Sequence, residues 1–118
     1  MDKDKKIVNK AMEILLHAGE SRNMIFEAFN DISLFEFDKA KKLLSDAQKE
    51  IVLAHKVQTC VLQDIASEIC PEEYSILFTH AQDTLMTIYS EYNIAMKIIN
   101  ITEKLNEKIN RIEENANV

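Results

Sequence analysis

Two polar residues, His80 and Asp83, interrupt an apolar repeat in the segment from Thr79 to Thr87. Residues three apart on a helix are neighbours on its surface, so this imidazole and this carboxylate would point the same way. An imidazole titrates near neutral pH and keeps a nucleophilic lone pair when it is uncharged, so a histidine needs no general base to attack an activated phosphoryl group. A purely structural histidine is the alternative that the spacing leaves open.

The sequence shows no phosphate-binding loop that could serve such a histidine. Its one glycine, Gly19, cannot build a glycine-rich loop, so a phosphoryl donor would have to be another phosphoprotein. Asp83 by itself is most simply a buried polar group bonded to a hydroxyl such as that of Thr87. Three copies of Asp83 on a symmetry axis would repel one another unless they were protonated or bridged by a hard cation such as Mg²⁺.

The remaining histidines and the cysteines are weaker candidates for chemistry. His17 and His55 have no carboxylate or cysteine partner at ligand spacing, and we interpret both as structural or exposed. We interpret Cys60 and Cys70 as small buried hydrophobic residues.

Composition predicts a single all-α domain over residues 1–118. Hydrophobic residues make up 47% of the chain and charged residues 29%, and one Gly and one Pro leave little turn chemistry, which favours a few long helices. The net charge of −6, with no basic stripe, argues against a nucleic acid partner. Without a signal-type segment or an apolar run of roughly 20 residues, the expected location is the cytoplasm.

Three amphipathic segments predict helices over about residues 5–31, 34–69 and 71–112, followed by a frayed tail over 113–118. Ser33 and Glu36 have the spacing of a capping box at the start of the second helix, and Asp38 is a second candidate for the cap. Pro71 suits the first position of the third helix. Because the apolar repeat continues across Gly19, we expect close helix packing there. Short connections make neighbouring helices antiparallel, which predicts an up-down-up three-helix bundle.

The three apolar stripes also predict the core. Its positions are Ile7, Ala11, Ile14, Ala18, Ser21, Ile25 and Ala28 in the first segment, Phe37, Ala40, Leu44, Ala47, Ile51, Ala54, Val57, Val61 and Ile65 in the second, and Tyr74, Leu77, Ala81, Leu85, Ile88, Tyr92, Ala95, Ile99, Leu105, Ile109 and Ile112 in the third.

The third segment carries further apolar residues outside its main stripe. They are Phe78, Met86, Tyr89, Met96 and Ile98. A helix that is apolar on more than one side is buried on more than one side, so we predict self-association, most simply a cyclic oligomer with the third helix near its axis.

Four blocks of this sequence, taken together, resemble a known family. His80-Ala81-Gln82-Asp83, followed by Leu85-Met86-Thr87, is similar to the active-site segment of the lactose/cellobiose-type enzyme IIA of the bacterial sugar phosphotransferase system. Ala18-Gly19-Glu20-Ser21-Arg22 resembles the small-residue step of that family's first helix. Phe37 with Ala40, and Ala54-His55-Lys56-Val57-Gln58-Thr59, resemble its second helix. The resemblance covers roughly residues 5 to 105.

The resemblance implies a homotrimer of three-helix bundles that relays phosphate. The phosphocarrier HPr would phosphorylate His80, which would pass the group to a cysteine of a cognate enzyme IIB while the membrane enzyme IIC imports a β-linked disaccharide. Asp83 would lie on the trimer axis and bind a shared metal ion, Mg²⁺. Gln82 and Gln58 would give polar support nearby.

Two positions depart from the family's pattern, and one rival function stays open. The family often has a second histidine where this chain has Thr84, and it tends to have Gly where this chain has Phe35. Around His80 we expect an apolar contact surface with Phe78 and Met86. The alternative to the relay is a non-enzymatic helical interaction module in which His80 and Asp83 only set the register.

Overall fold

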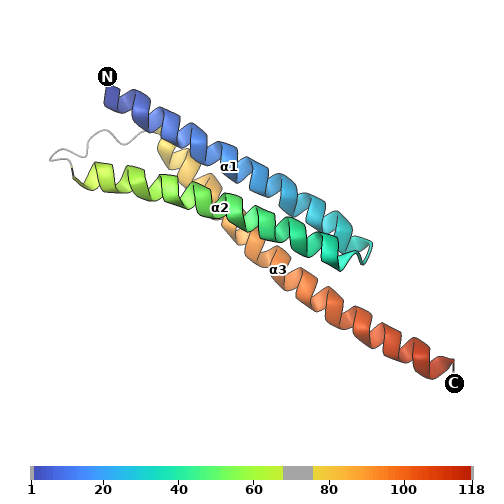
Figure 1. The fold of residues 1–118 in the computed structure, drawn as a ribbon. Coiled ribbons are helices and arrows are strands. Elements are labelled where there is room, and N and C mark those ends of the chain that lie inside the picture. Colours follow the sequence, from blue (N-terminus) through green and yellow to red (C-terminus); the bar gives the residue numbers. More distant parts are fainter. Residues whose placement is uncertain (1, 68–75, 118) are drawn as a thin grey trace.

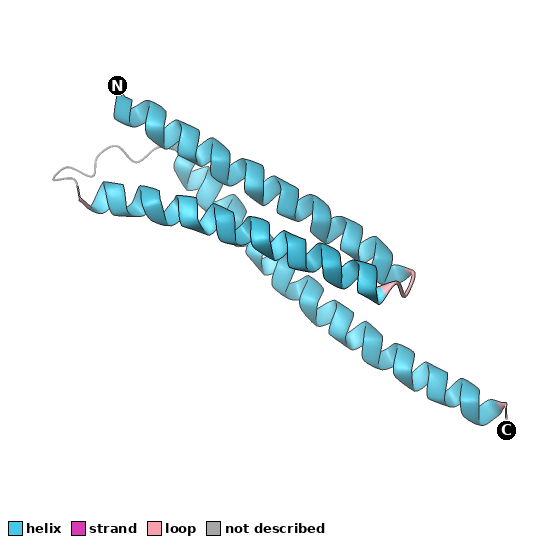
Figure 2. Ribbon diagram, viewed as in Figure 1, coloured by secondary structure: helices cyan, strands magenta, loops and turns pink. Residues whose placement is uncertain are grey.

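The computed structural model describes residues 2–67 and 76–117, which form three α-helices and no strand. Helix α1 spans Asp2–Ser33, α2 spans Phe37–Ala66 and α3 spans Ile76–Ala116 (Figures 1 and 2). α1 and α2 form an antiparallel hairpin, and α3 returns in the direction of α1 (Figure 1). The predicted all-α, up-down-up arrangement is confirmed. The predicted helix start at Pro71 and the helix end near Ile69 lie outside the described residues.

The predicted core is confirmed along the length of the bundle that all three helices share. Buried apolar residues recur every three or four positions, and small residues dominate where α1 meets α2. There Ser21, which is fully buried, donates a hydrogen bond from its Oγ to the carbonyl oxygen of Ala47 at 3.1 Å. Side chains this small let the two backbones approach closely. The Ser21 hydroxyl can be buried between them because it meets a backbone acceptor on the neighbouring helix.

The expected close packing at Gly19 is wrong. Gly19 is exposed, and a Cβ added to it would meet no atom within 4 Å. The small residues that do the packing are its neighbours Ala18 and Ser21, both fully buried. The repeat continues across Gly19 because Gly19 lies off the buried stripe.

The turn between α1 and α2 is a helix C-terminal motif, and the predicted capping box is wrong. The amide of Glu36 donates to the carbonyl of Asp31 at 2.9 Å, and the amide of Phe35 donates to that of Ile32 at 3.0 Å. This hydrogen-bond pair defines a Schellman motif, whose left-handed position is usually glycine. Here Phe35 occupies it, with a φ of 57°. The Ser33 hydroxyl bonds back to the carbonyl of Asn30, so α2 begins at Phe37 without a side-chain cap.

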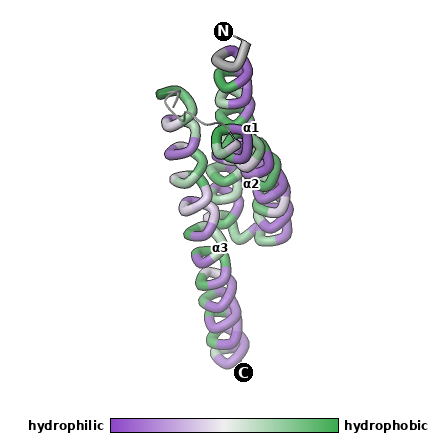
Figure 3. Tube along the Cα trace, turned by 90° about the vertical axis from the view of Figure 1, so that its left-hand side faces the viewer, coloured by the Kyte–Doolittle hydropathy of each residue, from purple (hydrophilic) through white to green (hydrophobic). Residues whose placement is uncertain are grey.

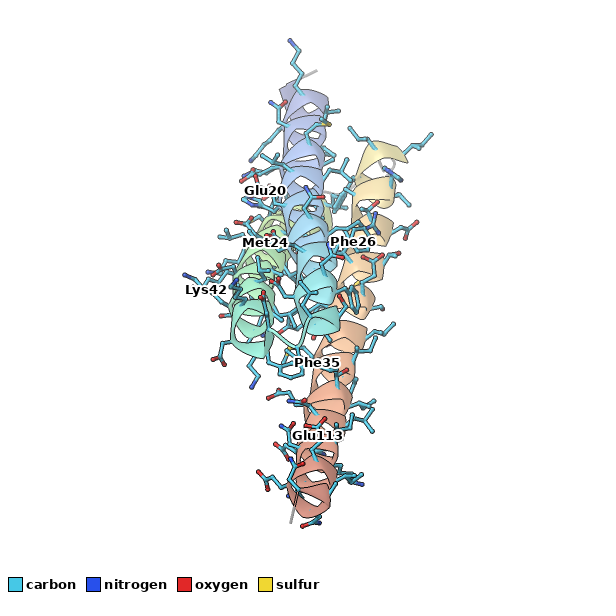
Figure 4. All side chains as sticks on the ribbon, turned by 90° about the vertical axis from the view of Figure 1, so that its right-hand side faces the viewer. Glu20, Met24, Phe26, Phe35, Lys42 and Glu113 are labelled. Carbon is cyan, nitrogen blue, oxygen red and sulfur yellow. The ribbon has the colours of Figure 1, made fainter. Side chains whose placement is uncertain are left out.

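The second half of α3 projects beyond the hairpin, where the predicted core and tail are both wrong. The predicted core residues Leu105, Ile109 and Ile112 are 54%, 47% and 66% exposed. The tail predicted to fray from residue 113 is helical to Ala116. The molecule is therefore long and narrow, 74 × 18 × 17 Å, and Figure 4 places Glu113 far along the projecting helix, well past Phe35 at the hairpin's turn.

Candidate functional site

His80 lies near the beginning of α3, on a stretch of helix that is anchored from its other side. Phe78, Ala81 and Leu85 are at most 1% exposed, and they hold this part of α3 against the hairpin. His80 itself is exposed. The helix therefore offers the imidazole to solvent from a fixed backbone.

Asp83 is exposed on the same side of α3, as its spacing from His80 predicted. The interpretation of Asp83 as a buried group bonded to Thr87 is wrong. The Thr87 hydroxyl donates to the backbone carbonyl of Asp83 at 2.9 Å, so the bond does not engage the carboxylate. At about 100° per residue, Asp83 faces away from the buried residues Ala81, Leu85 and Ile88.

Of the two glutamines predicted to support His80, Gln82 projects from another side of α3. Gln82 follows His80 by two residues, and positions two apart on a helix point about 200° away from each other. Gln82 and Gln58 are both half-buried. Gln82 lies on the side of α3 that carries Tyr89. The ring centroids of Tyr89 and His55 of α2 are 5.7 Å apart. Support of His80 by Gln58 stays a prediction.

Of the two apolar residues predicted to lie in a contact surface around His80, only Met86 is exposed. Phe78 is 1% exposed and belongs to the core, so it cannot meet a partner protein, whereas Met86 is 52% exposed. Met86 lies six residues after His80, about 120° around the helix from it.

The apolar surface level with His80 comes from α1, which the sequence analysis did not single out. Arg22 of α1 binds Glu91 of α3, and the two helices run in the same direction. His80 precedes Glu91 by eleven residues, and the same step back from Arg22 along α1 reaches Ala11, the residue directly before Met12. Met12 is 55% exposed and Leu16, one turn further on, is 61% exposed. Their signal in the sequence is that both are apolar yet lie outside the core stripe of α1.

The other two histidines are structural. The His17 Nδ1 lies 2.6 Å from the Glu50 Oε2, which joins α1 to α2, so the interpretation of His17 as structural is confirmed, although its partner is 33 residues away in the sequence. His55 meets Tyr89 edge to face. Both rings are half-buried, which leaves His80 as the exposed histidine of the three. Cys60 is an exposed free thiol, not the buried residue predicted, and Cys70 lies outside the described residues.

The described part of the chain does not by itself bring together a set of metal ligands. Among residues 2–67 and 76–117, no three side chains of His, Cys, Asp or Glu are grouped to hold an ion. Within the same ranges, no helix is both long enough and apolar enough to cross a membrane.

Comparison with known proteins assigns this chain to a family. Residues 9–103 match the family described as "PTS system, Lactose/Cellobiose specific IIA subunit". A lactose-specific EIIA component from Staphylococcus epidermidis is 38% identical over 78% of this chain and 88% of its own length. A lichenan-specific enzyme IIA component from Bacillus subtilis is 34% identical over 81% of this chain and 86% of its own length. The crystal structure of PtcA from S. mutans superimposes with a TM-score of 0.73 at 33% identity, covering 80% of this chain and 91% of that one.

Proposed function

Because the chain belongs to the family of lactose/cellobiose-specific IIA subunits of the sugar phosphotransferase system, we propose that it carries a phosphoryl group on His80. As a IIA component it is a phosphotransferase subunit of a system that takes up sugars of the lactose/cellobiose type. In the proposed relay, phosphorylated HPr is the donor, and a cysteine of a cognate enzyme IIB, which serves the membrane enzyme IIC, is the acceptor.

The observation that carries this proposal is the exposure of His80 on an anchored helix. His17 and His55 are each engaged across helices, whereas His80 faces solvent within the segment that matches the family. A nucleophile that receives its phosphoryl group from another protein must be reachable by that protein's active site. A rigid helix supplies position, which is the main requirement of phosphoryl transfer.

The transfer itself needs little from this chain beyond a neutral imidazole. One imidazole nitrogen forms a bond to phosphorus while the bond between phosphorus and the donor breaks. The second transfer reverses the roles, because the cysteine sulfur attacks phosphorus and the imidazole leaves. Met12 and Leu16 offer exposed apolar surface level with His80, on which either partner can dock through apolar contacts.

We further propose that the functional particle is a homotrimer with Asp83 near its axis. Support comes from the outward direction of Asp83 and from the exposed apolar residues that follow it on α3, among them Ile94 at 55% and Ile101 at 58% exposure. Since the described residues of one chain group no three ligands, a Mg²⁺ ion held by Asp83 would need one such carboxylate from each of three chains. When bound, the ion would offset the repulsion between these carboxylates.

The transported sugar in this proposal is a β-linked disaccharide. The relatives at 38%, 34% and 28% identity are named for lactose, lichenan and N,N'-diacetylchitobiose, which share β-linkages. The membrane component would exercise the choice among such sugars.

The test is the intact mass of the protein after incubation with phosphoenolpyruvate, enzyme I and HPr. We expect one acid-labile phosphoryl group on the wild type and none on His80→Ala. His55→Gln is the matched control, since it removes an imidazole that meets Tyr89 and should leave the phosphoryl group in place. Absence of the group on the wild type, with HPr shown to be phosphorylated, would favour the interaction module instead.

A further inference from the structure

The projecting part of α3 is a long helix that no other described part of the chain covers. From Lys104 to Asn117 every residue is exposed except the half-buried Asn106. The contact before this stretch is the ion pair between Lys41 of α2 and Glu103 of α3, at 2.9 Å. An isolated helix of about 12 to 15 residues is marginal in water, so a helix here calls for a stabilising partner.

The residues of this projection repeat as in a coiled coil. We define the stem as residues 98–116. Steps of four and three residues alternate through Ile98, Thr102, Leu105, Ile109, Ile112 and Ala116. This is the a/d pattern of a heptad repeat, with Ile98, Leu105 and Ile112 at d positions and Ile109 at an a position. Figure 3 shows hydrophobic segments recurring between hydrophilic ones along the projecting half of α3.

We propose that the stem binds the stems of other copies of this chain as a parallel coiled coil. The charged residues beside the apolar a and d positions of the stem favour other copies of this chain as the partner and a parallel arrangement. Lys108 takes a g position and Glu113 the following e position. In a parallel coiled coil the g residue of one helix meets the next e residue of its neighbour, so Lys108 of each chain meets Glu113 of another. In an antiparallel pair, g meets g and e meets e, which would oppose like charges.

The composition of the stripe agrees with three or more chains. Isoleucine at both a and d, as at Ile109 and Ile112, shifts coiled coils away from dimers. The stem proposal therefore rests on the homotrimer of the proposed function, and it adds an interface that begins inside the family match and runs beyond its end at residue 103. The apolar side of the stem also continues the outward side of α3 that carries Asp83, within about 80° on a straight helix.

Charge exchange in the full-length chain tests the stem. Lys108→Glu and Glu113→Lys each turn an attractive pair into a repulsive one, whereas the double variant restores attraction in the opposite sense. We expect each single variant to raise the concentration at half-assembly at least tenfold in sedimentation equilibrium, and the double variant to return it close to that of the wild type. In the single chain, Glu at position 108 would lie one turn from Lys104 and from Arg111, so weakened assembly cannot come from a weakened helix.

Three results would overturn the stem proposal: a wild type that stays monomeric, single variants that assemble like the wild type, or a double variant that fails to recover. Tighter assembly of Lys108→Glu would mean that Lys108 does not meet Glu113 of a neighbouring chain, and it would overturn the proposal too. The phosphorylation assay separates this proposal from the relay, because Lys108 lies 28 residues from His80, about 42 Å along the helix. If the wild type assembles but gains no phosphoryl group, the proposed relay is wrong and the stem proposal is unaffected.

Discussion

Arg22 of α1 and Glu91 of α3 form a two-bond ion pair, in which Nε donates to Oε2 at 3.1 Å and Nη2 donates to Oε1 at 2.9 Å. The two helices are separated in the chain by the whole of α2. A bidentate guanidinium–carboxylate pair has one preferred geometry. It therefore joins the two helices and also fixes the position of α3 along the axis of α1. It therefore helps to decide which residues of α1 lie level with His80.

Replacement of Arg22 by Lys tests this pair. Lysine keeps the charge but loses the planar fork, and both side chains are about a third exposed, so solvent weakens the interaction. We expect the free energy of unfolding to fall by about 0.5 to 1 kcal/mol in urea titration. The control is Lys39→Ala, which removes a pair with Glu36 whose lysine is 71% exposed and which should cost less. Equal losses from the two variants would show that the fork adds nothing.

Leu16→Asp tests the apolar surface level with His80. A carboxylate there would oppose a docking partner and remove apolar area, so the concentration of phosphorylated HPr needed for half-maximal rate should rise about tenfold. Leu53→Asp, on the exposed side of α2, is the matched control and should leave that concentration unchanged. An equal effect at both positions would point to general electrostatic repulsion.

At Gly19 we expect alanine to be better than glycine. Gly19 is exposed inside α1 and has free space for a Cβ, so Gly19→Ala should raise the free energy of unfolding by about 0.5 to 1 kcal/mol. Thermal unfolding at a fixed protein concentration measures the difference. A loss of stability would instead reveal another chain packed against this position.

At position 35 we expect the opposite order. Phe35 has a left-handed backbone, which an L side chain adopts at a cost of about 1 to 2 kcal/mol and glycine adopts freely. Phe35→Gly and Phe35→Ala both lose the ring contact with Phe37, so their difference isolates the backbone. The glycine variant should be the more stable by about 1 kcal/mol. If alanine were equal or better, the turn would have changed conformation.

Alkaline pH should expose the burial of Tyr92. Burial raises the pKa of Tyr92 above 10.0, and the nearby Tyr89 adds a smaller electrostatic contribution. Between the ordinary pKa and the raised one, the folded state holds a proton that the unfolded state has lost, so stability is full below about pH 10 and falls as pH rises beyond it. Tyr92→Phe should decline less steeply than the wild type in urea titrations above pH 10. Identical slopes would contradict the argument.

Periodicity alone predicted most of the bundle, because the recurrence of Ile14, Ala18 and Ile25 depends only on helix geometry. It could not predict which stripe residues find a neighbour. Leu105 and Ile112 continue the apolar repeat of α3, yet the hairpin ends before it can cover them. The predicted stripe of the third helix leaves out the buried Phe78, because a repeat at three- and four-residue steps allows two registers at the start of α3. The pair of His17 and Glu50 is separated by 33 residues, so no local pattern announces it.

The candidate site was predictable in part. The spacing of His80 and Asp83 predicted their shared side of α3, since three residues is nearly one turn. It did not predict that both are exposed, because exposure depends on how α1 and α2 lie against α3. The phosphocarrier role came from the four blocks of family resemblance, and a histidine three residues from an aspartate would not have indicated it.

The exposure of the His80 imidazole on the side of α3 also affects the rate of phosphoryl transfer through the proposed relay. Donor and acceptor proteins would need the same ring and the same adjoining surface of α1, so each excludes the other while it is bound. Throughput would then peak at balanced amounts of the two proteins and fall when either is in excess, even an unphosphorylated donor. The relative abundance of its partner proteins would in this way control the flow of sugar through the proposed relay.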